Sequence, residues 1–166
     1  MAYIVHHYLD ACILAKAVLQ EPGHSEVAAY LTKEPGFFFS ITPFAFYEAL
    51  GVLKRKWNQK KLSEAEYYLC VSRLAEFIEQ ELISIDADCD IPNRALLSTA
   101  RDLVGKYQID YSDAMQLLSV IHGKHRRNAY ESKTVFVSED DTLVKAARNE
   151  GLRTWHFGKE PAPTGA

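Results

Sequence analysis

Short runs of apolar, β-branched and aromatic residues alternate with longer helical patterns along this chain of 166 residues. Such alternation is typical of α/β crossovers, in which each helix returns the chain to the same end of a parallel sheet. We therefore predict an α/β fold with a mostly parallel central sheet flanked by helices. The predicted strands are Tyr3 to Leu9, Gly36 to Ile41, Leu82 to Asp86, Thr134 to Val137 and Arg153 to Phe157.

Helix starts are marked in the segments between these strands. Thr42 offers an N-cap oxygen, and Pro43 suits the first helical position. Ser63 and Glu66 have the spacing of a capping box, and the two helices that begin at these sites are expected to form a hairpin. The predicted helices follow Asp10, run from Pro43 to about Trp57, from Ser63 to about Gln80 and from Pro92 to about Lys106, and begin again at Asp110 and after Asp140.

Length and composition describe one globular domain. A chain of 166 residues buries about 70% of its unfolded surface when it folds. A content of 48% hydrophobic and 25% charged residues is ordinary for such a domain. We predict a single domain over residues 1–158 and a flexible tail over residues 159–166, which contains Pro161 and Pro163.

The chain shows no targeting pattern and no membrane-spanning pattern. It does not begin with a basic segment followed by an apolar one, and its most apolar stretch, Phe37 to Leu53, is interrupted by Pro43 and Glu48. Its three cysteines are odd in number and not closely paired, which suits a reducing compartment. We therefore expect a cytoplasmic protein without a membrane partner. The net charge of -3 gives no overall attraction to nucleic acid, so that partner needs a local basic patch.

Four acidic residues stand where the predicted topology brings them together. Asp10 and Asp140 each follow a strand-like run, and the ends of parallel strands share one rim, outside which the ligand crevice of such folds lies. Glu48 lies on a helix face that also carries apolar residues. Asp113 begins an apolar helical stripe, and Asp110 lies three residues earlier on nearly the same side.

Carboxylates gathered in this way have a chemical consequence. Each raises the pKa of the others through repulsion and desolvation, and a hard divalent cation such as magnesium or manganese removes that penalty. The bound ion lowers the pKa of a water molecule, orients it for in-line attack on a phosphodiester and neutralises charge on the phosphate. We therefore predict metal-dependent phosphodiester hydrolysis, with Asp10, Glu48, Asp113 and Asp140 as the metal-binding and catalytic residues.

Each of these acids also has a simpler explanation. Glu48 fits an ion pair with Lys54 or Arg55 across the helix surface. A carboxylate at the start of a helix caps it and complements its dipole, and this alternative applies to Asp10, Asp110 and Asp140.

Three kinds of residue near these acids also have more than one explanation. Ser138 either caps the last predicted helix or bonds a water or a metal-bound carboxylate. His6 and His7 are neighbours in a strand and point to opposite faces, so we expect a structural role for both. Cys12 is expected to be a small buried residue and not a nucleophile.

Four motifs follow one another along the chain: Tyr8-Leu9-Asp10-Ala11-Cys12, Glu48-Ala49-Leu50 with Lys54-Arg55, Asp113-Ala114-Met115-Gln116-Leu117, and Ser138-Glu139-Asp140-Asp141. In this order they resemble the PIN-domain nucleases, most closely the VapC-like toxins of toxin-antitoxin pairs. The resemblance covers nearly the whole chain. It implies a PIN-like three-layer fold, magnesium-dependent endoribonuclease activity, an antitoxin whose peptide blocks the site, and a homodimer.

The resemblance also assigns roles to individual residues. It implies that Asp10, Glu48, Asp113 and Asp140 hold the metal, with Asp110 and Ser138 as auxiliary residues. The spacing from Ser138 favours Asp140 over Asp141 as the last metal-binding acid. The family often has threonine where Ser138 stands, and threonine or serine where Ala11 or Cys12 stands, so a hydroxyl beside Asp10 is missing here.

RNA that approaches an acidic site needs basic residues around it to offset repulsion. The candidates lie in two groups, one on the helix that carries Glu48 and one in a polar segment near residue 125. Each of them also reads as part of a solvated surface. The RNA-binding candidates are Lys54, Arg55, Lys124, Arg126 and Arg127.

Two other functional classes remain open at this point. Aspartyl-phosphate chemistry in its phosphatase form expects an aspartate where Cys12 stands, and its receiver form expects a lysine where Val137 and Ser138 close a strand. A catalytically inactive PIN-like module that binds RNA or protein is the other class. An RNA-processing nuclease that is not a toxin has the same site as the predicted one.

Overall fold

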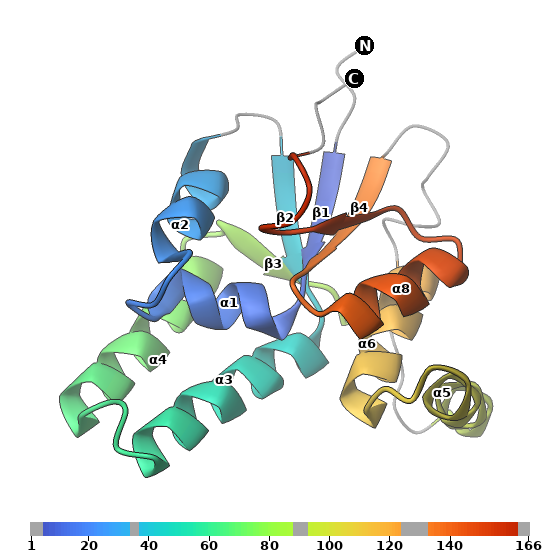
Figure 1. The fold of residues 1–166 in the computed structure, drawn as a ribbon, viewed down its shortest axis with the longest axis horizontal. Helices are drawn as coiled ribbons and strands as arrows, with labels where there is room; N and C mark the ends of the chain where they lie inside the picture. Colours follow the sequence, from blue (N-terminus) through green and yellow to red (C-terminus); the bar gives the residue numbers. More distant parts are fainter. Residues whose placement is uncertain (1–4, 34–36, 88–92, 124–132, 163–166) are drawn as a thin grey trace.

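The computed structural model describes residues 5–33, 37–87, 93–123 and 133–162, and Figure 1 shows its fold. A five-stranded sheet in the order β3-β2-β1-β4-β5 lies at its centre, and every strand pairs with its neighbour in parallel. The five predicted strands are confirmed, with ends that differ by a residue or two. The strands are β1 (Val5–Leu9), β2 (Phe37–Ile41), β3 (Ile83–Ile85), β4 (Lys133–Ser138) and β5 (Thr154–His156).

Helices connect the strands and cover both faces of the sheet (Figure 1). They are α1 (Ala11–Val18), α2 (His24–Lys33), α3 (Pro43–Asn58), α4 (Glu64–Glu79), α5 (Arg94–Tyr107), α6 (Tyr111–His122) and α8 (Asp141–Asn149).

The helix starts read from the sequence are largely confirmed. The Thr42 side chain accepts a hydrogen bond from the Ala45 N–H at 3.1 Å and so caps α3. Ser63 and Glu66 form both bonds of a capping box at the start of α4, and α3 and α4 pack together as the expected hairpin (Figure 1). The predicted start at Pro92 is corrected, because the Asn93 side chain caps α5.

One helix was not expected. The sequence predicts one helix after Asp10 and no separate helix before the second strand. In the structure α1 ends at Val18, and α2 starts directly after Gly23, whose φ of +88° turns the chain between them.

The apolar core lies in two parts on opposite faces of the sheet. Leu9 of β1 packs with residues of α1, α3 and α4. Its neighbour Tyr8 packs with residues of α5, α6 and α8 on the other face, as alternation along a strand requires. The result is three layers, with helices on both sides of the sheet, and it confirms the predicted fold class.

His6 and His7 are both buried, on opposite faces of β1. His7 is hydrogen-bonded to the Tyr30 hydroxyl and stacks on Phe37 with 4.5 Å between ring centroids. Burial lowers the pKa of His7 to about 4. A neutral ring packed among aromatic side chains fits the structural role expected for this residue.

The end of the described chain is bonded to the domain. Glu160 accepts a hydrogen bond from the His156 N–H at 3.0 Å and pairs with Arg148 at 2.6 Å. The segment predicted to be a flexible tail therefore starts with residues that have partners in the domain, and its last four positions lie outside the described residues. No helix of the described chain is long and apolar enough to cross a membrane.

Candidate active site

The carboxyl ends of β1 and β4 define the centre of the candidate site. These strands are neighbours in the sheet, whereas the chain leaves β1 through α1 and α2 to reach β2 on the other side. In open parallel sheets, ligands bind at the rim where the chain reverses direction in this way. Asp10 follows β1 directly, and Ser138 is the last residue of β4.

Asp10 is buried and held by three donors. Its carboxylate accepts hydrogen bonds from the Ala11 N–H at 2.6 Å, from the Cys12 thiol at 2.9 Å and from the Ser138 hydroxyl at 2.7 Å. Burial raises the pKa of Asp10, the three hydrogen bonds oppose that rise, and the negative charge of Asp140 adds to it. The side chain is therefore fixed in position, in surroundings that disfavour its negative charge.

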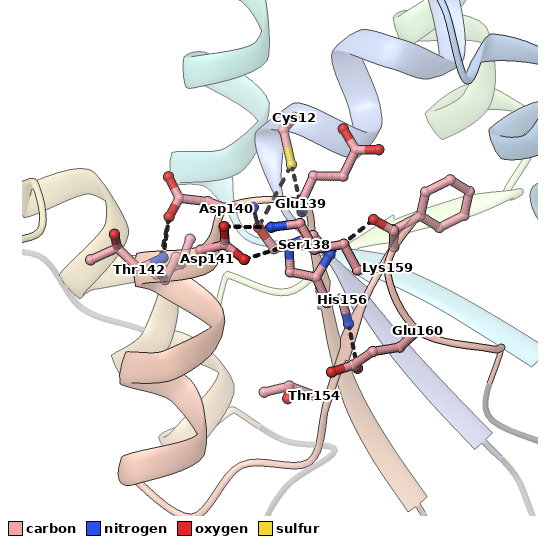
Figure 2. Close-up of polar contacts among 12 residues, drawn as sticks. Cys12, Ser138, Glu139, Asp140, Asp141, Thr142, Thr154, His156, Lys159 and Glu160 are labelled. Carbon is pink, nitrogen blue, oxygen red and sulfur yellow. Dashed lines mark hydrogen bonds and ion pairs between the residues drawn. The ribbon is translucent and has the colours of Figure 1, made fainter.

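Ser138 links two of the predicted acids. Its hydroxyl donates to Asp10 and accepts a hydrogen bond from the Asp140 N–H at 3.0 Å. Capping of α8 is done by Asp140, whose Oδ1 accepts from the Thr142 and Leu143 N–H groups at 2.7 and 2.9 Å (Figure 2). Of the two alternatives for Ser138, the structure shows the bond to a carboxylate. The N-cap alternative for Asp140 is also observed.

Asp140 and its neighbour Asp141 have different surroundings. Asp141 pairs with Lys159 at 2.5 Å and lies 3.0 Å from the His156 ring (Figure 2). The hydrogen bond from Lys159 is the main reason that the pKa of Asp141 is lowered. The charge of Asp140, in contrast, acts on Asp10. Asp140 is therefore the one that shares its surroundings with the other acids.

Glu48 reaches the site from α3 and faces α6. It accepts a hydrogen bond from the Gln116 amide at 3.1 Å. Burial raises the pKa of Glu48 and the charge of Asp10 raises it further, while a hydrogen bond from Ser112 and the charge of Arg55 lower it. Within the described chain, Glu48 forms no ion pair with Lys54 or Arg55 that would explain it as a surface residue.

Asp113, near the start of α6, shows how closely the acids are gathered. Its pKa is raised to about 7, first by burial and then by the charges of Glu48, Asp10 and Asp140. A hydrogen bond from the Asp110 N–H acts in the opposite direction. Asp113 therefore lies close enough to Glu48, Asp10 and Asp140 for their charges to raise its pKa, although the four acids come from separate elements.

Asp110 stands at the N-cap position of α6 but makes no side-chain cap bond. The cap alternative is therefore not observed for this residue. Asp110 acts on the site in two ways. Its backbone N–H donates a hydrogen bond to Asp113. Its charge raises the pKa of Glu48, by less than burial and the charge of Asp10 do.

The donor set suits a hard divalent cation. Carboxylate oxygens are the ligands that magnesium and manganese prefer. The pKa values of Asp10, Glu48 and Asp113 are raised first by burial and then by neighbouring negative charges, and a bound cation offsets both effects. Over the described residues, no three aspartate, glutamate, histidine or cysteine side chains are close enough to hold one ion as they stand.

Two residues of the site were missed in the sequence. The Cys12 thiol bonds Asp10 and accepts a hydrogen bond from the Glu139 N–H at 3.4 Å, so a donor does stand beside Asp10. Burial, followed by the charge of Asp10, raises the pKa of Cys12 well above its usual range, which keeps it a thiol. The other missed residue is Gln116, which is fully buried. The spacing of Cys12 from Asp10 is the sequence feature that could have predicted its role in the site. No sequence feature predicts the role of Gln116.

The basic candidates are placed unevenly. The charge of Arg55 reaches Glu48 and helps to lower its pKa against the effect of burial. Lys54 lies over the Trp57 ring, with its nitrogen 3.8 Å from the ring centroid. Trp57 of α3 stacks on Tyr67 of α4, so Lys54 faces this aromatic pair. Lys124, Arg126 and Arg127 lie outside the described residues.

Comparisons with known proteins add the fold. No protein-family model matches this chain, and no curated protein matches it in sequence. Among solved structures, PAE2754 from Pyrobaculum aerophilum has a TM-score of 0.56 and 15% identity over 93% of this chain and 92% of its own. The structure of FitAB bound to an IR36 DNA fragment has a TM-score of 0.58 and 13% identity over 95% of this chain and 99% of that one. These likenesses support a PIN-like fold.

Proposed function

We propose that this chain is an endoribonuclease that hydrolyses RNA with magnesium or manganese held by Asp10, Glu48, Asp113 and Asp140. The observation that carries the proposal is the raised pKa of Asp113, which results first from burial and then from the charges of Glu48, Asp10 and Asp140. A buried Asp10 and the half-buried Glu48 and Asp113, kept together beside the exposed Asp140, are costly for a protein without a cation to bind. The PIN-like fold supports the same function.

A divalent cation bound by these acids supplies a water of lowered pKa and charge to offset that of the phosphate. The residues of the chain hold the acids for that purpose. Ser138 and Cys12 orient Asp10, and Gln116 orients Glu48. Asp113, with a pKa of about 7, gives up its proton when the cation binds.

Cleavage of a total RNA pool tests this function. The purified chain is incubated with magnesium, manganese or a chelator, beside the Asp113→Asn variant and an Asp102→Asn control on the exposed side of α5. We expect discrete fragments that require a metal, disappear in Asp113→Asn and persist in the control. A parallel assay with single-stranded DNA determines whether the activity is confined to RNA. Absence of cleavage with every metal contradicts the proposal.

We also propose that the chain is the toxin of a toxin-antitoxin pair, with a homodimer as its assembly and a protein antitoxin that blocks the acidic rim. The support is the resemblance of its motifs together with the PIN-like fold. Light scattering on the purified chain measures the dimer. Growth arrest upon expression, relieved by Asp113→Asn, tests the toxin role; unimpaired growth with active enzyme points to an RNA-processing nuclease.

One observation favours a second candidate, an inactive PIN-like module that binds RNA or protein. It is the finding that, among the described residues, no three potential ligands are arranged to hold an ion as they stand. Calorimetric titration with manganese separates the two functions, because an inactive module has no need of the ion. Binding that depends on Asp10 and Asp113 supports the nuclease.

A further inference from the structure

An exposed tyrosine stands next to Glu48 on the outer side of α3. Tyr47 is 72% exposed, which is unusual for a large aromatic side chain. Its ring meets the Phe46 ring edge-on, with centroids 6.0 Å apart and planes at 68°. One edge of Tyr47 is thus supported by a neighbour while much of the ring remains open to solvent.

A cation lies farther along the same helix. The Arg55 side chain is exposed and, among the residues that the structure describes, forms no side-chain hydrogen bond or ion pair. A Cβ atom placed on Gly51 would lie 3.8 Å from Nη1 of Arg55, so the guanidinium extends back over this glycine toward Glu48. That distance is an ordinary van der Waals contact, so the Arg55 side chain lies along the surface of α3 at Gly51.

Tyr47, Gly51 and Arg55 are spaced at i, i+4 and i+8 and therefore form one ridge along α3. The ridge is about 12 Å long at 1.5 Å per residue. It begins beside Glu48, and the Arg55 side chain at its far end extends back toward that acid. An aromatic face and a positive charge along one ridge are the two contacts that single-stranded nucleic acid uses on proteins.

The other side of the acids carries a second exposed ring. Tyr111, the first residue of α6, is 53% exposed. It adjoins Ser112, whose side chain bonds Glu48. Open tyrosine faces therefore occur on both helices that meet at Glu48.

We propose that Tyr47, Gly51 and Arg55 form a substrate-binding strip, in which Tyr47 stacks on an unpaired nucleobase and Arg55 binds the phosphate next to the one that is cut. This inference rests on the proposed nuclease function. A base inside a duplex has both faces covered by its neighbours, so an exposed ring selects unpaired bases. A guanidinium suits a phosphate because its planar donors match the oxygen geometry.

Binding of a fluorescein-labelled random single-stranded RNA tests the strip, with calcium in place of magnesium so that the acids are neutralised without the proposed catalytic ion. The same RNA annealed to its complement is the second probe. We expect Tyr47→Ala to weaken single-strand binding about tenfold and duplex binding little. Tyr47→Phe keeps the stacking face and restores binding. Arg55→Gln weakens both probes and reduces the salt dependence by about one ion.

Matched controls are Tyr68→Ala, an exposed tyrosine on α4, and Arg101→Gln, an exposed arginine on α5. Both are expected to bind like the wild type. The proposal is overturned if the wild type does not bind single-stranded RNA or if Tyr47→Ala binds it normally. It is also overturned if Tyr47→Ala changes the oligomeric mass without changing RNA binding, because Tyr47 then belongs to a protein interface. If the Tyr47 and Arg55 variants bind RNA normally and the wild type cleaves RNA, the substrate-binding strip is wrong and the nuclease function stands. If the wild type binds RNA but does not cleave it, the nuclease function is wrong.

Discussion

Ser138 donates a hydrogen bond to Asp10 at 2.7 Å, although the two residues are 128 positions apart in the sequence. The bond joins the ends of β1 and β4, the neighbouring strands between which the candidate site opens. Since the same hydroxyl accepts the Asp140 N–H, one small side chain sets the separation of two acids. Loss of the Ser138 hydroxyl is therefore expected to change the positions of both Asp10 and Asp140.

Replacing Ser138 with alanine removes both bonds. Asp10 is buried and loses a donor, so its pKa should rise further and its affinity for a cation should fall. We expect unfolding to become easier by about 1–3 kcal/mol, measured by denaturant titration, with loss of most RNA cleavage. Ser138→Thr keeps the hydroxyl and is expected to retain most activity; equal loss in both variants would mean that volume, and not the hydroxyl, matters at this position.

Replacing Asp113 with asparagine should stabilise the metal-free protein at neutral pH. The folded-state pKa of about 7 lies above the value of 3.8 for a free aspartate side chain, so the stability that the protonated carboxyl contributes is complete below pH 4 and is lost as the pH rises through 7. Asparagine lacks this loss. Thermal unfolding in chelator should show a gain of roughly 1–4 kcal/mol above pH 7, since each pKa unit is about 1.4 kcal/mol. A gain that does not grow between pH 4 and 7 contradicts the assignment.

Replacing Cys12 separates its two properties. Cys12→Ser keeps a donor for Asp10, whereas Cys12→Ala removes it. We expect RNA cleavage and manganese affinity close to wild type for serine and about tenfold lower for alanine, because one hydrogen bond to a charged group contributes about 1.5–3 kcal/mol. Alkylation of the native protein should be slow, because the high pKa of Cys12 keeps it protonated. Equal cleavage by both variants would show that the thiol does not orient Asp10.

Asp140 and Asp141 provide a comparison of adjacent carboxylates. Asp140→Asn removes a charge that acts on Asp10 and Asp113 and should lower manganese affinity. Asp141→Asn affects the pairs with Lys159 and His156 and should leave that affinity nearly unchanged. Calorimetric titration of the two variants measures the difference. If Asp141→Asn is the more damaging, the chosen metal-binding residue is wrong.

Much of the site's position could be predicted from sequence. Asp10 and Asp140 follow apolar strand-like runs, and parallel strands place such residues on one rim whatever the details of packing. Thr42-Pro43 and the Ser63–Glu66 box fixed helix starts by local hydrogen bonding, which depends on adjacent residues only.

The contacts between distant elements could not be predicted. Gln116 bonds Glu48 because α3 packs against α6, and nothing in either helix alone indicates that crossing. Cys12 is not predicted as a site residue because no nearby residue in the sequence would activate its thiol. Its position in the first turn of α1 nevertheless lets the thiol donate a hydrogen bond to Asp10. The start of α2 depended on the positive φ of Gly23, which a Pro-Gly pair permits but does not require.

The proposed function depends on joint binding of a divalent cation by Asp10, Glu48, Asp113 and Asp140. Isothermal titration with manganese, on the wild type and on the Asp10→Asn, Asp113→Asn double variant, tests it most directly. We predict measurable binding with proton release near pH 7 in the wild type and none in the double variant, with both proteins folded. Unchanged affinity in the double variant would contradict the claim.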